Sequence, residues 1–223
     1  LNSYKRMIAR QRQTYGEEVA NVLTHGAGML LGLTAIVVLM MAAIRSGNPW
    51  AVGSFAVYAV CMTLSYVTST FYHASTHARQ KRLLRRFDHS AIYLHIAGTY
   101  TPFTLVALRQ EGYWGWSLFA IVWIAAVVGV WLSFRKMKKK DHLKTVCYLA
   151  MGWVVIIAFK PLLHVFRETG SMDVLYWLIG GGLFYTVGSL FFFLDKYKYM
   201  HPVWHFFVLG GSVCHFISIY LLV

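Results

Sequence analysis

The sequence has few charged side chains and very few acidic ones. Charged residues make up 13% of its 223 residues, and 21 lysines and arginines stand against 8 aspartates and glutamates. A soluble domain carries about 25% charged residues, and a chain of this length buries only about three quarters of its surface when it folds in water. With 58% hydrophobic residues, the chain has more apolar surface than a soluble fold can hide. We therefore expect it to fold in lipid.

Several other features are scarce or absent. The three cysteines all fall inside apolar stretches, so there is no pairing pattern for a disulfide framework. No segments show the alternation, about ten residues long, that marks a membrane β-barrel. We find no internal repeat and no cleavable signal pattern, because about twenty polar residues precede the first apolar run. We expect one domain over residues 1–223, with a short cytoplasmic N-terminal segment over about residues 1–17.

Seven apolar stretches are present, each close to the roughly 20 residues that a helix needs to cross the hydrocarbon core. Short polar connections marked by Gly and Pro separate them. The pattern predicts an all-α integral membrane protein, a bundle of seven transmembrane helices. We expect the spans over residues 20–44, 50–72, 91–108, 115–134, 146–166, 174–194 and 203–223.

The basic residues are concentrated in alternate connections. Seventeen of the 21 precede the first span or lie in the second, fourth and sixth connections, and the other four lie at or near the opposite side. Cytoplasmic loops collect Lys and Arg, so we expect the N-terminus in the cytoplasm and the C-terminus outside. The net charge of +13 then reflects topology and contact with anionic lipid head groups. We expect no nucleic acid as a partner.

Polar side chains at the cytoplasmic ends of the predicted spans form the candidate site, because such residues are costly in lipid and indicate function by default. Ser69 and His73 end the second span, Asp88 opens the third, and His201 and His205 open the seventh. Residues four apart share a helix face, and three imidazoles suit zinc while leaving a fourth position open for water. No acidic residue lies between the two histidines of the seventh span, so Asp88 is the candidate base or orienting group.

Each of these residues also has a structural interpretation. Asp88 follows a basic run and fits a helix N-cap, and the polar pair of the second span fits positions that face lipid head groups. Pro202 fits a first helical position, which would put His201 at or just before the start of its helix and loosen its pairing with His205. The residues alone leave both interpretations open.

Further polar residues of the predicted spans each have two interpretations. Glu18, Asn21 and His25 share one face of the first span, where they either pack as a polar face into the bundle or support the metal site. His95 lies about two turns deeper than Asp88, as a substrate contact or as a packed histidine.

Five segments resemble the hemolysin III family, the bacterial branch of the progestin and adipoQ receptor superfamily, which is similar to the alkaline ceramidases. They read EVANVLTH at 18–25, STFYH at 69–73, DHSAIY at 88–93, AGTYTP at 97–102 and HPVWH at 201–205. The resemblance covers nearly the whole chain and implies a seven-helix fold in a bacterial cytoplasmic membrane. It implies zinc held by His73, His201 and His205, with Ser69 and Asp88 beside the water on the metal.

The resemblance also suggests an activity. Superfamily relatives resemble amide hydrolases that act on ceramide-like lipids, and some are receptors. We expect a zinc-dependent hydrolase of a membrane lipid amide, in which Asp88 takes the proton of the attacking water and Ser69 holds the water or the oxyanion. The alternative is a non-catalytic lipid sensor, regulator or receptor-like protein with a structural zinc. A lytic protein, which the family name suggests, is less favoured because the sequence has no detachable amphipathic helix.

Overall fold

The structure, a computed structural model, describes residues 13–135 and 141–223, apart from the side chains of residues 141 and 142. Within those ranges the chain forms helices joined by short turns and no strand. The basic residues predicted before residue 13 and over 136–140 lie outside the described ranges. In chain order the elements are α2 (Tyr15–Arg45), α3 (Pro49–Ala74), α4 (Ala78–Pro102), the π-helical turn η1 (Phe103–Ala107), α5 (Trp114–Phe134), α6 (Asp141–Gly152), the 3₁₀ stretch η2 (Trp153–Ala158), α7 (Phe159–Glu168), α8 (Met172–Phe193) and α9 (Met200–Tyr220).

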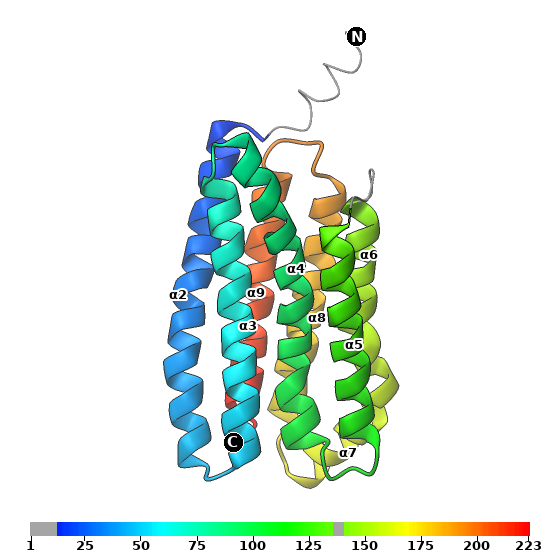
Figure 1. Cartoon of the computed structure of the whole chain (residues 1–223). Helices are drawn as coiled ribbons and strands as arrows, with labels where there is room; N and C mark the ends of the chain where they lie inside the picture. Colours follow the sequence, from blue (N-terminus) through cyan, green and yellow to red (C-terminus); the bar gives the residue numbers. More distant parts are fainter. Residues whose placement is uncertain (1–12, 136–140) are drawn as a thin grey trace.

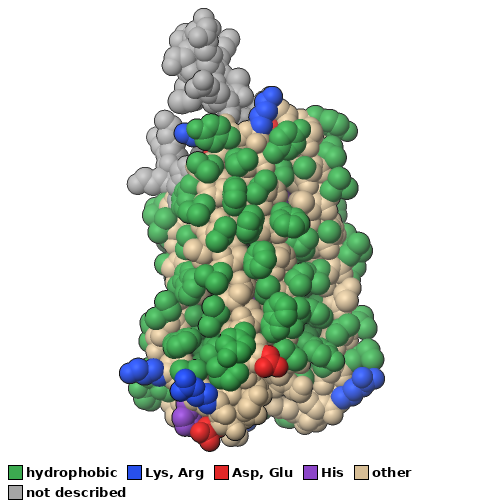
Figure 2. All heavy atoms as spheres, turned by 180° about the vertical axis from the view of Figure 1, so that it is seen from behind, with side chains coloured by type: hydrophobic (Ala, Val, Ile, Leu, Met, Phe, Trp, Pro, Cys, Tyr) green, Lys and Arg blue, Asp and Glu red, His purple; other side chains and the backbone are tan. Residues whose placement is uncertain are grey.

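Six helical segments of the described chain are long and apolar enough to cross a membrane. They are α2, α3, α5, the continuous segment Leu143–Glu168 made of α6, η2 and α7, and finally α8 and α9. Hydrophobic side chains cover the face of the bundle between its two ends, and the charged side chains gather at the ends (Figure 2). Large apolar side chains along the bundle are exposed, as expected where lipid replaces water. The chain is therefore a multi-pass membrane protein with an all-helical fold.

The third predicted span, residues 91–108, corresponds to the second half of α4 and to η1, and it does not meet the same criteria of length and apolarity. The first half of α4 carries the basic run, and its second half is almost wholly buried from Ser90 to Pro102. Neighbouring helices therefore shield the apolar part of α4 from lipid, which explains its modest hydropathy. That this segment crosses the membrane stays a prediction, as does the side on which each end lies.

Two irregular stretches, η1 and η2, interrupt the long helices. The first follows a proline, and the second is hydrogen-bonded by a tyrosine of another helix. Pro102 lacks a backbone N–H, and the π-helical turn η1 follows it directly. The 3₁₀ stretch η2 lies opposite Tyr100, whose hydroxyl donates to the carbonyl oxygen of Gly152 at 2.6 Å and accepts from the amide of Val155 at 2.9 Å. Irregular backbone at membrane depth needs such partners, because lipid supplies none.

Helix α2 lies at one edge of the bundle and packs against both α3 and α9 (Figure 1). Helix α4 packs between α3 and α5, and α8 packs along α9. Small residues allow these close approaches; a Cβ on Gly28 would meet the ring of Tyr66, and one on Gly129 would meet the ring of Tyr93. One end of the bundle, which we call the His73 end, holds the starts of α2, α4 and α9 and the end of α3. We call the opposite end the Arg109 end.

Candidate metal centre

The end of α3 and the start of α9 bring three histidines together. His73 lies one residue before the end of α3, and His201 and His205 lie in the first turns of α9. The ring centroids are 5.4 Å apart for His73 and His201, 5.0 Å for His73 and His205, and 4.6 Å for His201 and His205. One ligand nitrogen from each ring lies within 4.8 Å of the other two. The predicted convergence of the second and seventh spans is confirmed.

Helix α9 begins earlier than the sequence predicts, and this keeps His201 and His205 on one regular helix. The helix begins at Met200, so Pro202 is the third helical residue and His201 lies inside the helix. Proline is tolerated there because the first amides of a helix have no intrahelical acceptor. His201 and His205 therefore keep the i, i+4 spacing of a regular helix, and the expectation that His201 lies at or before the helix start is wrong.

The three rings suit a metal such as zinc in their donor chemistry. His73 and His205 are buried, and His201 is half-buried. The Nε2 atom of His73 and the Nδ1 atom of His205 are buried with no hydrogen-bond partner among the described residues, although buried ring nitrogens normally have one. Tetrahedral zinc with Zn–N bonds of about 2.0–2.1 Å separates its ligand nitrogens by about 3.4 Å, and one nitrogen of each ring here lies within 4.8 Å of the other two.

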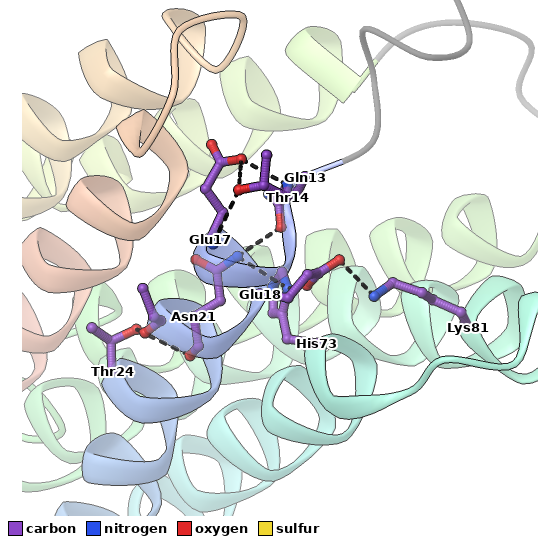
Figure 3. Close-up of polar contacts among 9 residues, drawn as sticks. Gln13, Thr14, Glu17, Glu18, Asn21, Thr24, His73 and Lys81 are labelled. Atoms are coloured by element: carbon purple, nitrogen blue, oxygen red, sulfur yellow. Dashed lines mark hydrogen bonds and ion pairs between the residues drawn. The ribbon is translucent and has the colours of Figure 1, made fainter.

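Glu18 of α2 determines which nitrogen of His73 faces the cluster (Figure 3). Its Oε2 lies 2.7 Å from Nδ1 of His73, and its Oε1 accepts from the Lys81 ammonium at 2.6 Å. A carboxylate only accepts hydrogen bonds, so the proton of the neutral ring is assigned to Nδ1 and the lone pair to Nε2. This is the carboxylate–histidine arrangement that fixes the ring orientation and tautomer of metal ligands.

Asn21 and His25 complete the contribution of α2. The Nδ2 atom of Asn21 lies 3.2 Å from Nδ1 of His73 and donates to Gln13 at 2.7 Å. The ring of His25 stacks on that of His205 at 3.7 Å with an interplanar angle of 29°, and Tyr66 meets its edge. The polar face of the first predicted span therefore packs into the bundle and touches the histidine cluster. Its role in supporting a metal stays a prediction.

Ser69 and Asp88 also lie near His73: Ser69 is buried four residues before it on α3, and Asp88 belongs to α4. The Ser69 hydroxyl is close enough to the Asp88 carboxylate for a hydrogen bond, and the charge of Asp88 interacts with His73, Arg85 and Lys144. Asp88 is not an N-cap, because α4 begins ten residues earlier at Ala78 and the basic run is itself helical. The N-cap interpretation is therefore wrong, and Asp88 lies within α4.

Other predicted residues lie outside the cluster. The ring of His95 is 6.1 Å from Tyr66 and 6.3 Å from Tyr58, and its Nε2 has no hydrogen-bond partner in the described chain. It lies deeper in the bundle and is not one of the three grouped ligands. The structure thus separates His95 from the histidine cluster and leaves its role as a prediction.

One contact at this site was missed from the sequence. The buried carboxylate of Glu17 accepts from the backbone amide and hydroxyl of Thr14, at 2.8 and 2.7 Å, and from the backbone amide of Tyr199 at 2.8 Å. Tyr199 has a left-handed backbone conformation, with φ of 64°, directly before α9. Glu17 therefore ties the start of α2 to the start of the helix that carries His201. The Thr-x-x-Glu capping box was the available signal.

The fold and the site define a multi-pass helical membrane protein with a three-histidine cluster at one end of its bundle. Comparison with known proteins identifies the family: residues 13–216 match the family described as Haemolysin-III related. The chain is 42% identical to Hemolysin-3 of Bacillus cereus over 212 residues, 95% of this chain and 94% of the relative. It is also 42% identical to the Hemolysin-3 homolog of Bacillus subtilis (strain 168) over 206 residues, 92% of this chain and 94% of the relative. The chain belongs to the haemolysin III family.

Proposed function

We propose that the chain is a zinc-dependent membrane hydrolase that acts on a lipid amide. The observation that carries the proposal is the group of three imidazoles whose donor nitrogens lie within 4.8 Å of one another. Three imidazoles suit zinc, and the Ser69 and Asp88 side chains beside them supply the polar groups that hydrolysis needs. A lipid follows from the membrane location, and the amide bond follows from the resemblance to the alkaline ceramidases.

Each residue has a chemical role in this proposal. His73, His201 and His205 would hold the metal, and zinc on three imidazoles supplies a Lewis acid that activates water near neutral pH and polarises a carbonyl. The Asp88 carboxylate accepts the proton of the attacking water. The Ser69 hydroxyl donates to the developing oxyanion or holds the water in place. Glu18 keeps the His73 ring oriented through its Nδ1 proton.

The proposal includes a membrane location and an orientation. We propose seven spans in a bacterial cytoplasmic membrane, with α4 and η1 as the third span and the His73 end in the cytoplasm. The positive-inside rule supports this orientation, since the described basic residues at the start of α4 and in the α8–α9 connection lie at the His73 end. Lipid substrates would then enter from the bilayer near the cytoplasmic head groups.

Metal content tests the site directly. Detergent-purified wild-type protein is expected to contain about one zinc per chain by mass spectrometry, because three histidines and one open position form a catalytic-type zinc site. His73→Ala and His201→Ala should each lose it. His215→Ala is the matched control, because that buried histidine lies on α9 away from the cluster and contacts the carbonyl oxygen of Leu178. Zinc retained in both cluster variants, or absent from the wild type, would contradict the proposal.

Hydrolysis of a fluorescent N-acyl lipid in detergent micelles separates an enzyme from a sensor. Asp88→Asn should keep zinc but lose about 100-fold or more of the rate, because a positioned general base contributes that much. A wild-type protein that binds zinc and hydrolyses no lipid amide would favour the alternative, a lipid sensor or receptor-like protein with a structural zinc. The name of the relatives suggests lysis as a third candidate, which dye release from liposomes by metal-free protein would support.

A further inference from the structure

A groove of about 530 Å³ lies among α3, α4, η1 and α5 towards the Arg109 end. Its volume falls in the range of about 300–1,000 Å³ that small-molecule sites occupy. Val57 is its lining residue nearest to the metal centre along α3, and it lies sixteen residues, or about 24 Å, from His73. The groove is therefore separate from the histidine cluster. Its walls include Trp50, Gly53, Val57, Thr101, Leu105 and Trp123.

Three polar side chains of the groove wall already have hydrogen-bond partners, namely Ser54, Thr101 and Trp123. The Ser54 hydroxyl donates to the carbonyl oxygen of Trp50 at 2.6 Å, and the Thr101 hydroxyl donates to that of Ala97 at 2.8 Å. The indole N–H of Trp123 donates to the Thr101 hydroxyl at 3.1 Å. A ligand inside the groove therefore meets satisfied polar groups and apolar surface. Such a wall favours a hydrocarbon chain, because a polar ligand would lose its hydration without gaining hydrogen bonds.

In contrast to the apolar groove wall, a positively charged side chain lies next to the groove. The Arg109 guanidinium lies over the ring of Trp50, 4.7 Å from its centroid, and Trp116 meets that ring edge-on at 5.7 Å. The Nε atom of Arg109 is buried and has no hydrogen-bond partner in the described part of the chain. A guanidinium with an unused buried donor attracts an anion that accepts more than one hydrogen bond. The cation thus lies against Trp50, a tryptophan that forms part of the groove wall.

We propose that this groove binds one acyl chain of a phospholipid from the leaflet at the Arg109 end, with the phosphate on Arg109. The apolar wall suits the chain, and the guanidinium suits the phosphate in charge and geometry. Helices α3 and α5 of the groove wall are long and apolar enough to span the bilayer, so a lipid of that leaflet would reach the groove by lateral diffusion while its second chain stays in the bilayer. The proposal is independent of the zinc site and of the hydrolase function.

Photolabelling of the purified full chain in dodecyl maltoside micelles tests the proposal. The probes are phosphatidylglycerol and diacylglycerol that carry the same photoactivatable acyl chain, and a free fatty acid with that chain. Phosphatidylglycerol is expected to label the peptides containing Val57 or Trp123 about tenfold more than diacylglycerol, because a hydrogen bond to a charged group is worth that factor or more. Equal labelling by these two probes, or stronger labelling by the fatty acid, would overturn the phospholipid assignment.

Two variants and two matched controls locate the binding. Arg109→Gln should reduce phosphatidylglycerol labelling to the diacylglycerol level. Arg167→Gln should not, because Arg167 is at the same end but on α7, which contributes no residue to the groove wall. Gly53→Leu should abolish labelling by both lipids, because a Cβ at Gly53 has open space around it and the larger side chain fills the groove. Gly26→Leu, at another glycine with open space, should label as the wild type does. Unchanged labelling in Gly53→Leu and Arg109→Gln would refute the site.

Discussion

The hydrogen bond between Glu18 and Nδ1 of His73 leaves Nε2 as the nitrogen of that ring without a hydrogen-bond partner among the described residues. The Nδ1 atom lies between the Glu18 carboxylate at 2.7 Å and the Asn21 amide at 3.2 Å. Lys81 contacts the other Glu18 oxygen at 2.6 Å and keeps the carboxylate in place. Because Glu18 is only partly exposed, this chain of contacts orients the ring before any metal arrives.

Replacing Glu18 tests this orientation. Glu18→Gln should weaken zinc binding about 10- to 100-fold, the usual cost of changing the partner of a metal-bound histidine, because the amide lacks the charge that holds the Nδ1 proton. Competition with a chelator of known affinity measures the change. Glu111→Gln is the control, since Glu111 is 3.9 Å from His164 and outside the cluster. A dissociation constant within twofold of the wild type would refute an orienting role for Glu18.

At the same scale, the sequence could predict which histidines converge but not how they are held. Spacing placed His201 and His205 on one helix face, and depth placed His73 beside them, because helix geometry and bilayer thickness are regular. The contact between Glu18 and His73 depends on how α2 rotates against α3. That rotation is decided by side-chain packing between distant segments, so no local pattern reveals it.

Among the elements, α4 shows why a criterion based on hydropathy alone misses a helix that is shielded from lipid. Residues 90–107 form a continuous helical path of roughly 27 Å through α4 and η1, close to the thickness of the hydrocarbon core. Their side chains include His95, Thr99 and Thr101, all buried by other helices. A helix shielded from lipid can carry polar groups that a lipid-facing helix cannot, so its composition resembles that of a soluble core helix. The sequence predicts residues 146–166 as one uninterrupted span and does not reveal the 3₁₀ stretch η2. The irregular backbone at η2 could not be seen in the local sequence, because it is hydrogen-bonded by Tyr100 of another helix.

Helix α2 offers a matched pair of glycines for testing close packing. Gly28→Ala should destabilise the protein by about 1–3 kcal/mol, because its Cβ would meet the buried Tyr66 ring, which the Ser212 hydroxyl holds at 2.7 Å. Gly26→Ala should stabilise it by about 0.5–1 kcal/mol, since nothing lies within 4 Å of a Cβ there. Unfolding in mixed detergent micelles measures both free energies. Equal shifts in the two variants would show that the contact between α2 and α3 is not tight at Gly28.

Over the whole molecule, the two ends of the bundle differ in chemistry. The His73 end combines the histidine cluster with the basic side chains at the start of α4, and the Arg109 end combines tryptophans with a few arginines. An amphiphile at the first end would meet the histidine cluster, and one at the second end would meet a cation next to an apolar groove. The two proposed sites therefore face opposite leaflets if the helices span the bilayer as proposed.

Thiol labelling of intact cells tests that arrangement and the status of α4. In a background where Cys61, Cys147 and Cys214 are replaced by alanine, single cysteines are introduced at exposed turn positions, and a membrane-impermeant reagent is added. Ser46→Cys, Gln110→Cys and Thr169→Cys should be labelled, because they lie in turns at the Arg109 end. Thr76→Cys and Lys196→Cys should be protected until the membrane is permeabilised.

The pair Thr76 and Gln110 decides the number of spans, because α4 and η1 lie between them. Opposite labelling of the two positions means that this segment crosses the bilayer, which gives seven spans and puts the metal centre on the protected side. Identical labelling means that α4 does not cross, and the basic run at its start would then need another explanation than the positive-inside rule. Reversed labelling of all five positions would keep seven spans but move the metal centre to the outer face, where water-soluble substrates from outside the cell reach it.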